Sequence, residues 1–206
     1  MTLSGTAVER RRAALRAGWV AAHRPVAGVP RGVRLAAYAV PFTVLPSSLW
    51  RIAVCTFHAP VARRTLTADL GSSGIPGLPL ELYVVLLSIA SELLAFTAVG
   101  LVAGWGEVFP RWIPGLRGHR VPVGLAVIPG AAAAIGLTVL SAWVAISYPL
   151  AIRVDGSAAT DQRPLGFGDW QGVLAVIAYA PLLLWGPLLG LVTINYRRRR
   201  RDSVAR

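Results

Sequence analysis

The chain has 206 residues, of which 55% are hydrophobic, and carries a formal net charge of +12. Its mean hydropathy is +0.59, and it exceeds the roughly 45–50% apolar content of soluble domains, which excludes an ordinary water-soluble protein. The absence of lysine excludes Schiff-base chemistry, and the single cysteine, Cys55, excludes an internal disulfide and a paired-thiol redox site.

Four apolar segments follow one another along the chain, and each reaches the roughly 20 residues that a bilayer-spanning helix needs. They lie at 35–57, 80–103, 122–148 and 172–195. Backbone groups in hydrocarbon must be hydrogen-bonded internally, so these segments are predicted to be helices. We therefore expect an all-α integral membrane bundle of four up-down transmembrane helices, with no separate soluble domain.

The flanking segments complete this organisation. Residues 1–34 form a basic N-terminal arm with seven arginines, and residues 196–206 form a basic tail. No small-residue cleavage pattern follows the first apolar segment, so we expect a membrane span and not a signal peptide. The predicted division is a cytoplasmic arm (1–34), a four-helix transmembrane domain (35–195) and a cytoplasmic tail (196–206).

Arginines are distributed unevenly between the two sets of loops. The arm, the loop between the second and third segments and the tail together hold 16 arginines and three acidic residues. The other two loops, together with Glu81 at the start of the second segment, hold four arginines and five acidic residues. Cytoplasmic loops carry the excess of basic residues. Both termini are therefore predicted to be cytoplasmic, in a multi-pass protein of the plasma membrane.

Polar residues form stripes on the first two predicted spans. They are Ser47, Ser48 and Arg51 on the first span and Glu81, Ser88 and Glu92 on the second. Arg51 lies about six residues from the outer end and Glu92 about eleven, or roughly 9 Å against 17 Å deep. Arg51 is expected to pair with Glu92 or with Glu81. A structural ion pair, a site for a proton, an ion or a headgroup, and an arginine that reaches to the outer surface are the alternatives.

The loop GWGEVFPRWIPGLRGHRVP, residues 104–122, interrupts the apolar sequence. Trp105 and Trp112 are typical of a membrane–water interface, and the arginines can face anionic headgroups. A second interpretation is an anion site, because arginine binds phosphate or carboxylate through two parallel hydrogen bonds. A surface for a cytoplasmic partner protein is the third. The candidate contacts are Glu107, Arg111, Arg117, His119 and Arg120.

The same loop, with the stretch YAPLLLWGPLLG at 179–190, resembles a family of uncharacterised four-span membrane proteins of actinobacteria. The arginine-only basic set and the richness in alanine, glycine and proline are also typical of the high-GC genomes of that group. The resemblance implies a bacterial plasma-membrane protein and no particular activity.

Small residues and prolines recur within the predicted spans. Gly100 and Gly104, and also Gly186 and Gly190, form GxxxG pairs, and residues 130–136 read GAAAAIG. Such residues let helices pack closely in lipid, within the bundle or between two copies of the chain. Prolines within three of the spans are expected to kink helices and could line a cavity.

Other function classes lack their residues. The three histidines are far apart, so neither a metal site nor a bis-histidine haem is expected, and no nucleotide-binding glycine motif is present. The arginine run 197–201 directly follows a predicted span, which favours an anionic-lipid anchor over nucleic-acid binding. No cofactor is expected.

These observations favour a non-enzymatic membrane protein that binds a lipid or a partner protein within its bundle. The alternatives are a small transporter or channel subunit that uses Arg51 and Glu92, and an intramembrane enzyme acting on a lipid-like substrate. Membrane lipids with anionic headgroups are the expected partners, and a partner protein or a homo-oligomer is the other option.

Overall fold

The computed structural model describes residues 8–10, 12–13, 26, 28–62, 77–106, 119, 121–147 and 168–202. These residues form helices and turns and contain no extended strand. The principal helices are α2 (Arg31–Cys55), α4 (Leu80–Gly100), α5 (Val123–Ser147), α6 (Trp170–Tyr179) and α7 (Trp185–Asp202), with short 3-10 turns η1 (Gly104–Gly106) and η2 (Ala180–Leu184). The predicted all-α class is therefore confirmed for the described part of the chain.

Three helical stretches are long and apolar enough to cross a bilayer. They are Leu80–Gly100, Val123–Ile146 and Trp170–Asp202. The first predicted segment coincides with α2, which has 25 residues and is about 37 Å long at 1.5 Å per residue. Helix α2 is not among the three candidate stretches, because Arg51, Ser47, Ser48 and two prolines lower its hydropathy.

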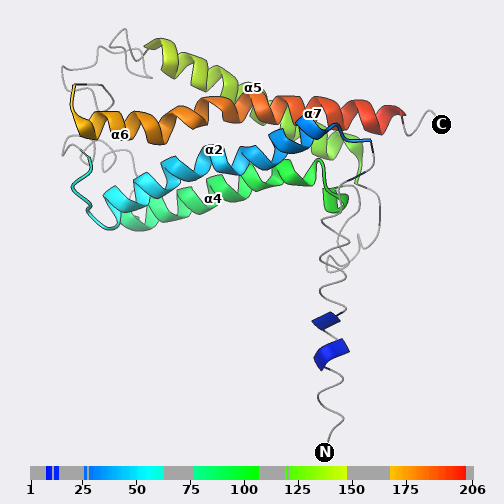
Figure 1. The fold of residues 1–206 in the computed structure, drawn as a ribbon, viewed down its shortest axis with the longest axis horizontal. Helices are drawn as coiled ribbons and strands as arrows, with labels where there is room; N and C mark the ends of the chain where they lie inside the picture. The colour runs from blue at the N-terminus through cyan, green and yellow to red at the C-terminus, as the bar shows by residue number, and fades with distance from the viewer. Residues whose placement is uncertain are drawn as a thin grey trace, which may run out of the picture.

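The helices lie in a row in which α2 is central (Figure 1). It packs against α4 on one side and against α6, η2 and α7 on the other, whereas α5 packs on α7 and η2. Neighbouring helices in this row run in opposite directions, and the C-terminal end of α5 diverges from the other helices. The basic end, as we call it, holds the beginnings of α2 and α5 and the ends of α4 and α7.

Local sequence explains where the helices begin and break. Pro30 and Pro79 directly precede α2 and α4, and proline fits a helix start because the first N–H groups have no partner there. Asp169 begins α6 by accepting a hydrogen bond from Gly172 N at 3.1 Å. Pro181 lies in η2, the 3-10 turn between α6 and α7, because proline cannot donate the helical hydrogen bond.

Close packing of small residues joins α5 to α7. A Cβ atom at Gly186 would lie 2.6 Å from the backbone N of Thr138 and 3.0 Å from the carbonyl oxygen of Ala134. Gly130 similarly faces the hydroxyl of Thr193. In contrast, Gly136 has open space around it. The second GxxxG pair thus brings two helices together, as small residues do in lipid.

The buried residues form two apolar clusters along the bundle. The larger one lies toward the basic end, around Val40, Val44, Ala95 and Val192. The smaller one lies toward the far end, around Trp50, Val54, Val84 and Ala175. Ala134 is the residue of α5 that belongs to the larger cluster. The core is therefore built mainly from α2, α4, α6 and α7.

Candidate functional site

Ser48, Arg51, Ser88 and Glu92 form a polar cluster between α2 and α4. Arg51 Nη2 donates to Ser48 Oγ over a long 3.5 Å, and the Glu92 carboxylate of the neighbouring helix lies close to both Ser48 and Arg51. Two charged groups and a hydroxyl are thus brought together between α2 and α4. The arrangement keeps both charges inside a segment that is otherwise apolar.

Arg51 forms no direct ion pair with either predicted carboxylate among the described residues. Among the described residues, Arg51 lies within 4.0 Å of neither the Glu92 nor the Glu81 carboxylate. Glu81 is exposed in the first turn of α4. Of the two carboxylates predicted as partners of Arg51, Glu92 lies beside Arg51 and Ser48, whereas Glu81 lies at the start of α4.

Several atoms of this cluster are buried and have no hydrogen-bond partner. They are Ser88 Oγ, Glu92 Oε1 and Arg51 Nε. Ser88 is only 2% exposed. Ser47 differs, because its hydroxyl donates to the Val44 carbonyl oxygen of its own helix at 2.8 Å. Buried polar groups are normally satisfied, so the cluster has capacity for further hydrogen bonds.

Aromatic side chains close the cluster toward α6. Trp50 and Tyr179 meet edge to face, with ring centroids 5.5 Å apart. Cys55 is buried in the same region. No group of three His, Cys, Asp or Glu residues is arranged for a metal ion among the described residues. The groups that Arg51, Ser48, Ser88 and Glu92 present can form hydrogen bonds and charge pairs.

The arginines near the end of α7 secure the basic end. Arg199 Nη2 donates to the Leu101 carbonyl oxygen at 3.3 Å, and Arg200 Nη2 donates to that of Val121 at 2.9 Å. Both guanidinium groups also lie within about 6 Å of the buried Tyr196 ring. The Tyr196 hydroxyl donates to Gly106 O at 3.3 Å. These contacts tie α7 to the segments that follow α4 and precede α5.

Most of the predicted loop site lies outside the described residues. This applies to Glu107, Arg111, Arg117 and Arg120. His119 is described and is exposed. The anion site, interfacial loop and partner surface predicted for this loop therefore stay predictions.

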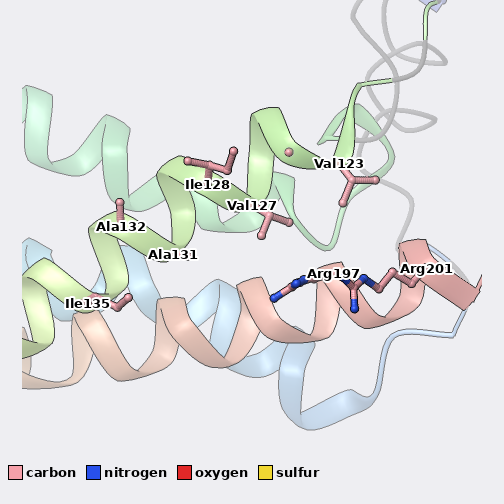
Figure 2. A pocket seen from close by; sticks show the side chains of 9 residues that line it. Val123, Val127, Ile128, Ala131, Ala132, Ile135, Arg197 and Arg201 are labelled. Carbon is pink, nitrogen blue, oxygen red and sulfur yellow. The ribbon is translucent and has the colours of Figure 1, made fainter.

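An open groove runs between α5 and α7 from the basic end (Figure 2). We call it the α5–α7 groove; its volume is about 560 Å³. Its apolar lining includes Val123, Val127, Ile128, Ala131, Ala132 and Ile135. Arg197 and Arg201 complete it from α7 and lie on the side of that helix that faces α5. Two arginines one helical turn apart can bind an anionic group, and the apolar groove beside them can bind a hydrocarbon chain.

This groove was not predicted from the sequence. The arginine run 197–201 indicated an anionic-lipid anchor, but the i, i+4 spacing that places Arg197 and Arg201 on one face of a helix was not used. A second, shallower groove of about 330 Å³ continues along the same flank, where Thr138 and Val139 of α5 face Gly190 and Ile194 of α7. The whole flank is therefore hollowed and apolar.

Comparisons of the chain with protein-family models, with curated proteins and with solved structures find no match. The function must accordingly be argued from the residues and their arrangement.

Proposed function

We propose that the chain is a four-span protein of a bacterial plasma membrane, with both termini cytoplasmic, that binds a membrane lipid and catalyses no reaction. Its membrane-embedded character rests on the three long apolar helices. The fourth span, the orientation and the lipid are the further steps of the proposal.

Packing supports α2 as the fourth span. It is 25 residues long and packs against α4, α6 and α7. A helix enclosed by membrane-spanning neighbours can carry polar residues, because those residues face protein and not hydrocarbon. Ser47, Ser48 and Thr43 of α2 are all buried in this way.

The distribution of arginine supports the orientation. The basic end gathers α2's beginning, which holds Arg31 and Arg34, and α7's end, which holds Arg197–Arg201. The excess of basic residues marks the cytoplasmic side of a membrane protein. With four spans, this distribution supports a cytoplasmic location for both termini.

The hollowed flank of α5 and α7 is the observation that carries the lipid-binding function. Only 6% of the α5 span is buried, against 28% for α4. Both grooves described above lie on this flank, with volumes of about 560 and 330 Å³. Grooves of roughly 300–1,000 Å³ with apolar linings are typical of small-molecule sites, and in a bilayer a lipid chain is the molecule that surrounds such a flank.

Mass spectrometry of the protein released in mild detergent tests this function. We expect a lipid retained at a defined stoichiometry after repeated washing in detergent. The outcome that would contradict the function is a protein free of lipid at every detergent concentration that preserves the fold. Recovery of a defined partner chain in place of lipid would assign the flank to a protein.

A second candidate function, passage of a proton or ion, is favoured by the polar cluster. Ser88 Oγ, Glu92 Oε1 and Arg51 Nε are buried without partners and could bind water or an ion. Vesicles that contain the purified protein would acidify faster than empty vesicles under an imposed potential, and Glu92→Gln would remove the difference. Equal rates with and without the protein would exclude this function.

A further inference from the structure

We propose that the α5–α7 groove selects an anionic phospholipid of the cytoplasmic leaflet, with one acyl chain along α5 and the phosphate between Arg197 and Arg201. This inference rests on the proposed lipid-binding function and adds the lipid class, the binding residues and the direction of the chain. Two observations support this inference. They are the positive charge at the mouth of the groove, which complements a phosphate, and the length of the apolar lining.

The apolar part of the groove has the length of one leaflet. Its lining runs from Val123 to Ile135 on α5, which is about 18 Å at 1.5 Å per residue. Half of the roughly 30 Å hydrocarbon core is about 15 Å. The groove begins at the basic end, where α5 begins, and extends inward from there (Figure 2). An acyl chain would therefore lie against α5 over the full depth of its leaflet.

The charged part of the groove lies where a headgroup would be. Arg197 and Arg201 are exposed and one turn apart on α7, and both line the groove. Within the part of the chain that the structure describes, neither guanidinium group has a hydrogen-bond partner. Two guanidinium groups at this spacing can bind a phosphate through paired hydrogen bonds.

The five arginines of the run 197–201 have different contacts, because successive positions face different sides of α7. Arg199 and Arg200 bind carbonyl oxygens of Leu101 and Val121, so they are part of the fold. Arg197 and Arg201 face the groove, and Arg198 is exposed outside it. A general basic anchor would use every exposed arginine equally. A specific headgroup site would depend on Arg197 and Arg201, which line the groove, and much less on Arg198. Lipid binding by variants of these arginines therefore distinguishes the two cases.

The test compares two double variants of the full chain that lose the same charge. Retention of phosphatidylglycerol and of phosphatidylcholine is measured by native mass spectrometry after exchange into mixed micelles. Arg197→Gln with Arg201→Gln is expected to weaken phosphatidylglycerol binding roughly 30-fold. The matched pair, Arg198→Gln with Arg206→Gln, is expected to change it less than about threefold. Phosphatidylcholine retention should be alike in all three proteins.

A second pair of variants tests the acyl-chain channel without changing charge. Ala132 and its neighbour Ala133 are both exposed, but only Ala132 lines the groove. Ala132→Phe should fill the channel and reduce retention of phosphatidylglycerol, and Ala133→Phe should leave it unchanged. Unfolding temperature in detergent shows that each variant is folded.

The possible outcomes distinguish failure of the proposed headgroup site from failure of the proposed lipid-binding function. If the wild type retains phosphatidylglycerol and the two charge variants lose it equally, the headgroup site is wrong and lipid binding stands. If the wild type retains neither lipid, the proposed function fails as well. A wild-type dimer that dissociates with Ala132→Phe, without lipid retention, would assign the groove to a second copy of the chain and overturn the proposal.

Discussion

Helix α2 is polar and surrounded by other helices, whereas helix α5 is apolar and largely exposed. Helix α2 holds Arg51 and several hydroxyl groups, and it is surrounded by α4, α6 and α7. Helix α5 has no charged residue, and its span is 6% buried. Large apolar side chains such as Ile128, Ile135 and Trp143 are exposed along it.

This difference is what a lipid environment favours. In water, apolar side chains gather inside and polar ones face out. In a bilayer, hydrocarbon surrounds the protein, so the most apolar helix can lie at the edge and the polar helix needs protein neighbours. The order of α4, α2, α7 and α5 follows this rule.

Gly186→Leu should detach α5 from the bundle. The added side chain would meet backbone atoms of Thr138 and Ala134, which cannot move aside as a flexible side chain could. We expect a loss of about 3 kcal/mol or more in unfolding free energy, at the upper end of overpacking effects. Thermal unfolding in detergent measures it. Gly136→Leu is the matched control, because its position is open; an equal loss there would refute the close α5–α7 contact.

Ala37→Leu should strain the centre of the bundle. Ala37 is fully buried in α2 within the larger apolar cluster. Overpacking such a site costs about 1–3 kcal/mol. Ala133→Leu on the exposed face of α5 should change unfolding free energy by less than about 0.5 kcal/mol, as surface substitutions do. Comparable losses in the two variants would contradict the central place of α2.

Glu92→Gln should weaken the α2–α4 contact. The change removes the charge beside Arg51 and keeps an oxygen that can accept from Ser48. We expect a loss of about 1–3 kcal/mol in urea or thermal unfolding, because the partly buried Arg51 loses a neighbouring counter-charge. Glu81→Gln, at the exposed helix start, should be nearly neutral. Unchanged stability of Glu92→Gln would exclude a structural role for the carboxylate.

Ser88→Ala should have the smallest effect. The Ser88 hydroxyl is buried without a hydrogen-bond partner among the described residues. Removing an unsatisfied group is close to neutral, within about 0.5 kcal/mol. A loss of more than about 1 kcal/mol would mean that the hydroxyl binds a water molecule or an ion. The same unfolding measurement therefore reports on occupancy of the polar cluster.

Much of the helical layout could be predicted from hydropathy alone. The segments 80–103 and 122–148 correspond closely to α4 (Leu80–Gly100) and α5 (Val123–Ser147). The last segment was less regular, because Pro181 lies in a 3-10 turn between α6 and α7. The helix also continues through the arginine run to Asp202, since arginine favours helix and a basic last turn suits the helix dipole.

The relations between helices were harder to derive. Periodicity placed Ser48 and Arg51 on one face of the first segment, but it could not show that Glu92 of the second segment lies beside them. The α5–α7 groove had no sequence signal of its own. It depends on where Gly186 meets Ala134, a contact between residues far apart in the chain. Nearly uniform apolar sequence in α5 gives no preferred face from which such a contact could be inferred.

The four-span topology requires α2 to cross the membrane, although α2 is not among the three stretches that are apolar enough to do so by composition alone. Single cysteines in a Cys55→Ala background test it most directly, at Ser4→Cys, Ser72→Cys, Ser157→Cys and Ser203→Cys. A membrane-impermeant maleimide is added to intact bacteria that produce each variant. Four spans predict labelling at 72 and 157 in intact cells, and at 4 and 203 only after permeabilisation. Labelling of positions 4 and 72 from the same side would contradict the account, because α2 would then not cross.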